Sequence, residues 1–214
     1  MKTFAVLGLG KYGAAIACQL FNMGYEVLAV DKDMNKVNAI SDFVTQAVGA
    51  DIKDETTMNS LGISNCDCVI VATGDLSTSV LAVLYLKEMG IKKIICKAID
   101  KNHEKVLNKI GADMIVIPEY EMGIKTAISL VSGNVIDYIE LSEEYSIIDR
   151  AVPSSWINKT IAQLNVRSKY GINIIAIKNN ENLDEVIIAP GADYKFNSTD
   201  IVVFVGKNEI MNKL

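Results

Sequence analysis

The sequence predicts an α/β fold in which a parallel β-sheet has helices on both faces, followed by a crossover helix and a small α+β domain. Three observations indicate this fold. Up to about residue 132, short apolar runs alternate with amphipathic segments, which is typical of βα units. The apolar runs are hydrophobic on both alternations, as strands covered on two faces are. After Pro118 the pattern changes to shorter strands with few helical segments.

The first domain is expected to contain six strands. They fall at residues 3–8, 26–31, 43–48, 67–72, 93–97 and 114–117. Apolar residues recur at helical spacing between them, for example Ile16, Leu20 and Phe21 in the first connection.

A crossover helix is predicted over residues 119–132, and Gly133 and Asn134 are expected to end it. Its apolar positions, which include Met122 and Ile124, form a wider band than one sheet face requires and therefore predict a second packing partner.

The remaining residues are expected to form the small α+β domain. Strands are predicted near 135–141, 146–151, 172–177, 186–189 and 201–205, with a helix near 160–165. We therefore predict a first domain at residues 1–133, including the crossover helix, and a C-terminal domain at residues 134–214.

A glycine-rich loop joins the first strand to the first helix. Gly8 permits a tight turn, Gly10 lets backbone N–H groups approach a phosphate, and Gly13 lets the helix pack closely on the strand. Asp31 ends the second strand, where a carboxylate can accept hydrogen bonds from a ribose diol. Strand, loop, helix and acid together predict a Rossmann-type domain that binds a nucleotide.

Composition disfavours several other classes. The 214 residues have a formal net charge of −5 and no block of like charge, so we expect no nucleic-acid partner. No apolar run of about 18 residues is present, and the first strand begins too early for a signal peptide, which predicts a cytosolic protein. The four cysteines fall on predicted helices or strands without the spacing of a zinc or redox motif.

No catalytic constellation is visible. The single histidine, His103, lies in a polar run that begins a helix, where we expect a solvated side chain. Ser/His/Asp groupings and paired-carboxylate motifs are also missing. The residues therefore favour a binding protein that is not an enzyme, and an NAD-dependent oxidoreductase is the alternative.

Several segments carry a resemblance to a known family. They are residues 8–13, 67–75, 97–98, 110–113, 118–123 and 164–171. Together they resemble the RCK (regulator of potassium conductance) family, specifically the cytosolic gating subunits of the Ktr and Trk potassium transporters. The resemblance covers nearly the whole chain.

This resemblance implies a set of ligands and partners. The first domain would bind ATP, ADP or NAD(H). Dimers of the chain would assemble into an octameric ring, docked at the inner face of the cell membrane on a separate potassium-transporting subunit. A sensor of a different transporter is a further alternative, because such second domains also occur outside potassium systems.

The glycine loop and the resemblance together give the candidate nucleotide contacts in the first domain. These are Gly8, Gly10, Lys11, Tyr12, Gly13, Asp31, Lys32, Asp51, Thr73, Gly74 and Asp75.

Some of these residues also have a purely structural interpretation. Lys11 stands where the family commonly has arginine, so it keeps the positive charge but loses the bidentate fork. Lys32 is either a solvated charge or a group that tolerates a ribose phosphate. Asp51 and Asp75 could equally be turn formers or helix caps.

The resemblance implies two further sites. Glu119 would help to hold a divalent cation, although an acid in the first turn of a helix is also favourable by itself. Cyclic di-adenosine monophosphate (cyclic di-AMP) would bind the second domain at a dimer interface, at Asn165, Arg167, Asn173, Ile174 and Pro190. The alternative is that the isoleucine belongs to a strand and the arginine to a surface ion pair. Trp156 either anchors an interface or is simply buried.

Overall fold

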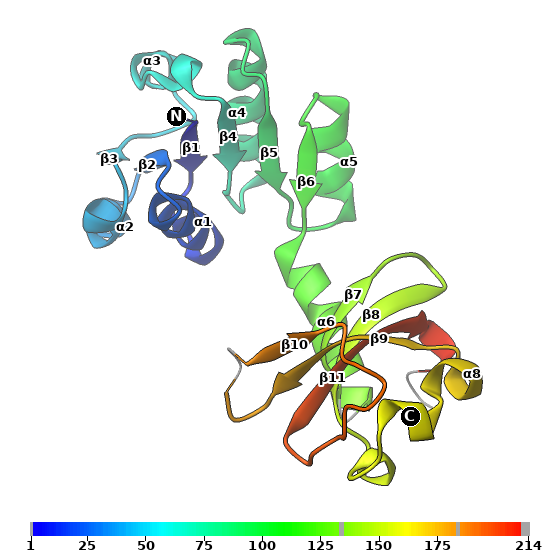
Figure 1. The fold of residues 1–214 in the computed structure, drawn as a ribbon. Helices are drawn as coiled ribbons and strands as arrows, with labels where there is room; N and C mark the ends of the chain where they lie inside the picture. The colour runs from blue at the N-terminus through cyan, green and yellow to red at the C-terminus, as the bar shows by residue number, and fades with distance from the viewer. Residues whose placement is uncertain (1, 133–134, 183–184, 211–214) are drawn as a thin grey trace. The chain divides into compact units, whose positions relative to one another are not determined.

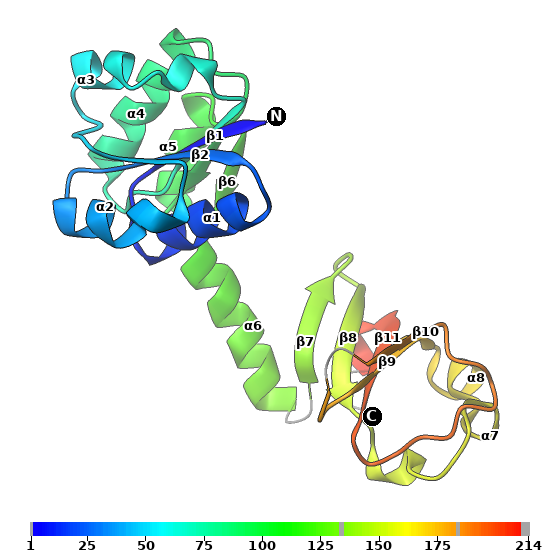
Figure 2. The ribbon, with the colours of Figure 1, turned by 60° about the vertical axis from the view of Figure 1, so that its left-hand side comes forward.

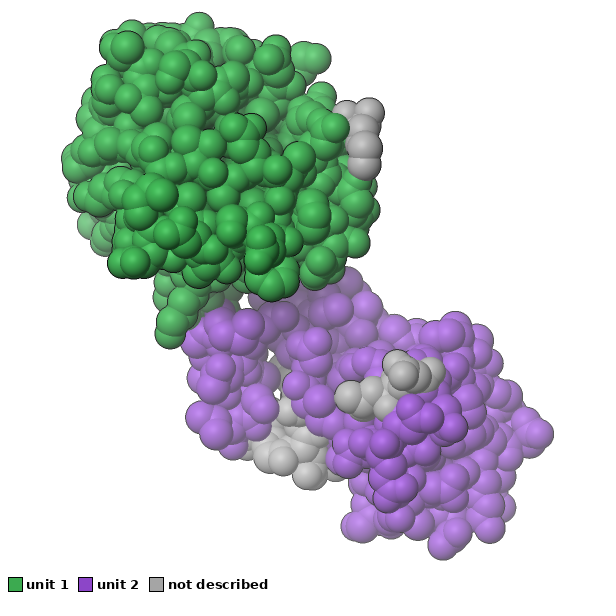
Figure 3. Space-filling model, turned by 90° about the vertical axis from the view of Figure 1, so that its left-hand side faces the viewer, with its two compact units in different colours: residues 1–121 green, residues 122–214 purple. Residues whose placement is uncertain are grey.

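The computed structural model describes residues 2–132, 135–182 and 185–210. The chain divides into two compact units, residues 1–121 and 122–214 (Figure 3). This division falls inside helix α6 (Pro118–Ser132). The predicted helix end at Gly133 and Asn134 lies outside the described residues, and the predicted domain boundary there stays a prediction.

The first unit contains a six-stranded parallel sheet in the order β3-β2-β1-β4-β5-β6 (Figure 1). The strands are β1 (Thr3–Leu7), β2 (Glu26–Asp31), β3 (Gln46–Gly49), β4 (Cys68–Val71), β5 (Ile94–Lys97) and β6 (Met114–Val116). The predicted Rossmann-type sheet is confirmed. The strand order reverses at β1 and β4, and open α/β sheets bind ligands at the carboxyl ends of strands at such a switch point.

Helices cover both faces of this sheet, as predicted (Figure 2). One face carries α1 (Lys11–Asn22) and α2 (Met34–Ile40), and the other carries α3 (Glu55–Ser60), α4 (Leu76–Glu88) and α5 (Lys101–Lys109). Each face has its own apolar core, which explains why the strands are hydrophobic on both alternations.

The third strand begins later than predicted. Residues Ser41–Phe43 form a turn of 3-10 helix, and β3 starts only at Gln46. Val44 is buried all the same, because it packs with the core under α1 and α2. The predicted strand was too long at its start because Val44, which is apolar and buried, lies next to the true strand.

The prediction of a solvated His103 is wrong. Its side chain is only 2% exposed, and it shares the buried face of α5 with Leu107. Residues four apart lie on the same side of a helix, so the spacing to Leu107 was the available signal. Asp100 caps this helix by accepting hydrogen bonds from Asn102 N and His103 N.

The second unit is built on an antiparallel sheet in the order β10-β9-β11-β8-β7. Its strands are β7 (Val135–Glu140), β8 (Tyr145–Ala151), β9 (Asn173–Asn179), β10 (Val186–Ile188) and β11 (Asp200–Lys207). Two short helices, α7 (Ile161–Leu164) and α8 (Val166–Tyr170), accompany it. The predicted α+β domain is confirmed, with α8 as an addition to the predicted helix.

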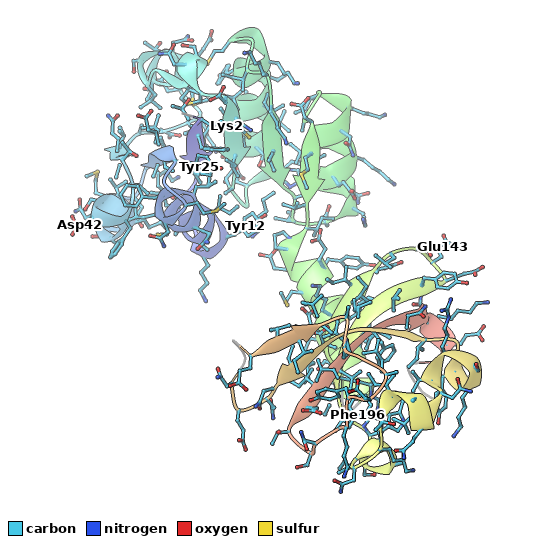
Figure 4. All side chains as sticks on the ribbon, in the orientation of Figure 1. Lys2, Tyr12, Tyr25, Asp42, Glu143 and Phe196 are labelled. Carbon is cyan, nitrogen blue, oxygen red and sulfur yellow. The ribbon has the colours of Figure 1, made fainter. Side chains whose placement is uncertain are left out.

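The core of this unit is aromatic. Phe196 (labelled in Figure 4) is fully buried. Its ring packs against the rings of Trp156 and Tyr194. Trp156 is itself 2% exposed and also packs on Tyr170. Of the two interpretations of Trp156, the structure supports burial within its own unit.

Helix α6 presents apolar side chains to solvent in a single chain. Met122 is 61% exposed and Ile124 is 43% exposed. A second packing partner for this helix stays a prediction. Among the described residues, no helix has both the length and the apolar character needed to cross a membrane.

Candidate functional site

A cleft of about 400 Å³ opens at the carboxyl ends of the strands of the first unit. It is lined by Gly8, Val30, Asp31, Lys32, Lys36, Ala50, Asp51, Ile52, Lys53, Thr73, Asp75 and Thr78. Six of the predicted contact residues are on this list: Gly8, Asp31, Lys32, Asp51, Thr73 and Asp75. They come from the ends of four neighbouring segments that parallel pairing brings to one edge of the sheet.

The glycine loop contributes Gly8 to the cleft lining and requires glycine at two positions. Gly8 has φ +99°, which favours glycine, and donates its N–H to the carbonyl of Val30 at 2.7 Å. A Cβ on Gly13 would lie 1.9 Å from the carbonyl oxygen of Gly8. The first turn of α1 can therefore approach the loop only because position 13 has no side chain.

Gly10 differs from these two glycines. It is the N-cap of α1 with φ −66°, and a Cβ placed on it would meet nothing within 4 Å. No side chain caps this helix end, and its first turn carries no acidic residue. Such an uncapped N-terminus leaves its N–H groups and positive dipole end available to an anion.

Asp31 joins the loop to the second strand. Its side chain is nearly buried, and its Oδ2 accepts a hydrogen bond from Leu9 N at 2.7 Å. Oδ1 accepts from Asp33 N at 2.9 Å, and Lys36 Nζ lies 3.3 Å from Oδ2. Burial by itself would raise the pKa of Asp31, but the hydrogen bonds from Asp33, Leu9 and Lys36 hold it below its ordinary value. The carboxylate is therefore ionised and held in a fixed position.

The opposite side of the cleft is closed by a second ion pair. Lys53 Nζ lies 3.3 Å from Asp75 Oδ2. Asp75 also caps α4, accepting from the N–H of Thr78 at 2.8 Å and from the hydroxyls of Ser77 and Thr78. The Thr78 hydroxyl, the Ser77 hydroxyl, the Thr78 N–H and Lys53 together hold the pKa of Asp75 far below its usual range.

Asp51 forms the turn that positions Lys53. Its Oδ1 accepts a hydrogen bond from Lys53 N at 3.0 Å. Asp51 and Asp75 thus have the turn-forming and capping roles that we gave as alternatives, and they also line the cleft. In such a site a structural role and a ligand-facing position are compatible.

Three polar lining residues were missed by sequence reasoning, namely Lys36, Lys53 and Thr78, together with the apolar Val30, Ala50 and Ile52. The only signal for Lys36 was its place five residues after Asp31, where the first turn of α2 returns toward the end of β2. A lone surface lysine is more often solvated, so the sequence alone does not single it out.

The other predicted contacts of the first unit lie on the glycine loop, on α1 and after β4. Lys11 is exposed at the first position of α1, and Gly74 is exposed in the loop before α4. Tyr12 is partly buried on α1 (Figure 4). Burial, followed by the charges of Glu121 and Glu119, raises the pKa of its hydroxyl.

Glu119 forms an ion pair with Lys97, which lowers the pKa of the carboxyl. No group of three or more His, Cys, Asp or Glu side chains that could hold a metal occurs among the described residues. The Glu119 carboxylate is thus neutralised by a lysine. A cation at Glu119 stays a prediction.

The predicted cyclic di-AMP residues lie on two neighbouring parts of the second unit. Asn165 (φ +44°) separates α7 from α8, and Arg167 is exposed on α8. Asn173 and Ile174 begin β9, and Pro190 follows β10, which pairs with β9. The described residues give Arg167 no ion pair.

The cavity found in this unit, of about 390 Å³, is formed by other residues. It is lined by Ile177, Lys178, Asn179, Glu185, Val186, Ile187, Tyr194, Asn197, Thr199 and Asp200. The second-unit site therefore stays a prediction.

The fold and the cleft define a class: a Rossmann-type binding domain joined to a small β-rich domain. Comparison with known proteins identifies the family within this class. Residues 4–118 match the TrkA-N domain, and residues 147–214 match the TrkA-C domain. The chain belongs to the RCK family, and within it to the Ktr and Trk type of potassium uptake proteins.

Relatives across bacteria support this assignment. The chain is 45% identical over 206 residues to Ktr system potassium uptake protein C of Bacillus subtilis, covering 96% of this chain and 92% of that one. Ktr system potassium uptake protein A of Vibrio alginolyticus is 34% identical over 215 residues, covering 100% and 96%.

Solved structures share the fold. The RCK domain of GsuK matches with a TM-score of 0.66 at 14% identity, covering 98% of this chain and 46% of that one. The GsuK channel bound to NAD matches with a TM-score of 0.54 at 21% identity, covering 100% and 37%. The chain therefore spans less than half the length of these two structures.

Proposed function

We propose that this chain is the cytosolic regulatory subunit of a potassium uptake system and that it binds an adenine nucleotide, ATP, ADP or NAD(H), in the cleft of its first unit. The bound nucleotide would control a separate membrane subunit that conducts potassium. The observation that carries the proposal is a buried, ionised Asp31 in the cleft lining, held by the N–H of Leu9 next to the open helix N-terminus at Gly10.

Each end of the cleft suits one part of a nucleotide. The uncapped start of α1 suits phosphates, and the carboxylate of Asp31 suits ribose hydroxyls. Lys32, Lys36 and Lys53 balance the charges of the three aspartates in the lining. The GsuK structure that carries NAD holds a ligand of this class.

Regulation requires the nucleotide to distinguish two states of the assembly. A ligand shifts an equilibrium only by its difference in affinity for the two states. ATP and ADP differ in the γ-phosphate, whose charge can reach Lys11 at the first turn of α1. The octameric ring and the docking on a membrane subunit are part of this proposal.

The alternative is an NAD-dependent oxidoreductase. The cleft residues give it little support, because Asp75 and Asp31 are held ionised by several donors and His103 is buried away from the cleft lining. None of the three is then a free acid or base for a substrate.

The test is potassium uptake by cells that express the chain together with a Ktr-type membrane subunit. Wild type should increase uptake over the membrane subunit alone. Asp31→Asn should reduce the increase, since loss of the charged acceptor weakens nucleotide binding by about tenfold. Asp42→Asn is the matched control, because Asp42 is exposed on the short turn before β3, outside the cleft lining (Figure 4).

Two outcomes would count against the proposal. One is uptake that does not depend on the chain, and the other is an Asp31→Asn variant that behaves like wild type. Steady consumption of NADH with a small carbonyl compound would instead favour the oxidoreductase. Uptake of a solute other than potassium would favour a sensor of a different transporter.

A further inference from the structure

The carboxylate of Asp31 has nearly all its acceptor positions filled. Each carboxylate oxygen has two lone pairs. Oδ2 accepts from Leu9 N at 2.7 Å and from Lys36 Nζ at 3.3 Å, so both of its positions are taken. Oδ1 accepts from Asp33 N at 2.9 Å and keeps one position. A ribose diol donates two hydrogen bonds, and only one position is open to it.

The three present donors are not equally easy to remove. Leu9 N and Asp33 N are backbone groups fixed by the glycine loop and by the start of α2. A buried backbone N–H that loses its acceptor costs free energy. The Lys36 ammonium sits on a flexible stem, and its side chain is 45% exposed. It can leave Asp31 and be hydrated again at little cost.

We propose that Lys36 competes with the ribose of the nucleotide for Asp31, is displaced when both ribose hydroxyls bind, and thereby sets how strongly the cleft selects for ribose. The inference rests on the proposed nucleotide site and adds a specificity-determining residue to it. Removal of the ammonium frees the second lone pair of Oδ2, so both hydroxyls can bind without displacing another donor.

The test compares ADP with 2′,3′-dideoxy-ADP, which has the same base and phosphates but no ribose hydroxyls. Calorimetric titration of the full chain gives the ratio of the two dissociation constants, dideoxy-ADP over ADP. We expect this ratio to rise about twofold to fivefold in Lys36→Met relative to wild type, the range for an exposed ion pair. Any general effect of lost positive charge on phosphate binding cancels in the ratio.

Lys32→Met is the matched control. Lys32 lines the same cleft and is exposed, but it makes no hydrogen bond or ion pair with Asp31 within the described part of the chain. Its ratio should equal that of wild type. Lys36→Gln keeps a donor without the charge and should give an intermediate ratio.

The outcomes separate this inference from the proposed function. If wild type binds ADP but the ratio is unchanged or lower in Lys36→Met, or rises equally in Lys32→Met, Lys36 does not compete for Asp31. If wild type binds neither nucleotide at millimolar concentration, the proposed function itself fails and the inference fails with it.

Discussion

Single glycines in the loop at residues 8–13 have different physical roles, although they look alike in the sequence. Gly13 is required by packing, because a Cβ there would lie 1.9 Å from the carbonyl oxygen of Gly8. Gly10 has an ordinary φ and open space around it. The sequence motif contains both glycines, but only the folded structure distinguishes Gly13, which packing requires, from Gly10, which has open space around it.

This difference predicts losses of stability of different size for two alanine variants. Gly13→Ala must push the loop away from α1 and should lower the free energy of unfolding by about 3 kcal/mol, as overpacking does. Gly10→Ala should cost no more than about 1 kcal/mol, the difference between glycine and alanine at an N-cap. Urea unfolding measures both values, and equal stability of the two variants would contradict the close approach at position 13.

His103 gives a prediction about pH. Its Nδ1 accepts from Ile99 N at 3.3 Å, and its buried Nε2 has no partner among the described residues. Burial lowers the pKa of His103, although the charges of Asp100 and Asp75 act to raise it. The unfolded chain, with a pKa near 6.5, therefore takes up this proton before the folded chain does.

The contribution of His103 to the free energy of unfolding should accordingly be fully present above about pH 7 and decrease as the pH drops below about 6.5. Urea unfolding between pH 7.5 and 5.5 measures the slope of the unfolding free energy against pH. This range lies above the pH at which carboxylates titrate. His103→Asn keeps an acceptor for Ile99 N and should remove most of the slope. A slope that persists in that variant would show that another group titrates.

At the residue scale, the sequence predicts a position where a motif determines it, and does not where packing against a neighbour determines it; the ligand contacts themselves stay predictions. Gly8 and Asp31 could be placed at the cleft because strand ends converge in a parallel sheet. Lys36 and Lys53 could not, since their positions depend on ion pairs with Asp31 and Asp75 that only the folded chain forms. The burial of His103 likewise depends on the packing of α5 against its neighbours.

Among the secondary-structure elements, the six strands of the first unit were predictable because continuous apolar runs are rare outside buried strands. Helix α8 was not predicted. Asn165 adopts φ +44°, ends α7 after one turn and begins α8 in a new direction. A left-handed residue of this kind interrupts the apolar spacing that sequence reading relies on.

Helix α7 depends on its cap more than on its length. Thr160 accepts from Gln163 N at 3.2 Å, and Gln163 Oε1 accepts from Thr160 N at 2.9 Å, which is a capping box. Thr160→Ala should lower the free energy of unfolding of the second unit by about 1 kcal/mol. Urea unfolding followed by Trp156 fluorescence reports on this unit.

Ser155→Ala serves as the control for this variant. Ser155 is exposed in the preceding turn and should leave the midpoint unchanged. Equal midpoints for wild type, Ser155→Ala and Thr160→Ala would mean that the capping box does not stabilise the unit.

For the whole molecule, the sequence places a nucleotide-type domain before a small β-rich domain, and membership of the RCK family agrees with that order. A packing partner for the exposed apolar side chains of α6 and a ligand of the second unit both stay predictions. The structure of a single chain therefore describes the cleft of the first unit, whereas the proposed oligomer requires contacts between chains.

The most direct measurement of the central claim is calorimetric titration of ADP into wild type and Gly10→Ala, with the stability of both measured alongside. Wild type should bind ADP, and Gly10→Ala should bind at least about tenfold more weakly, because a methyl group at position 10 enters the space that the phosphates need. Its urea midpoint should stay near that of wild type. Equal ADP affinity in the two proteins, or no ADP binding by wild type, would contradict a phosphate site at the start of α1.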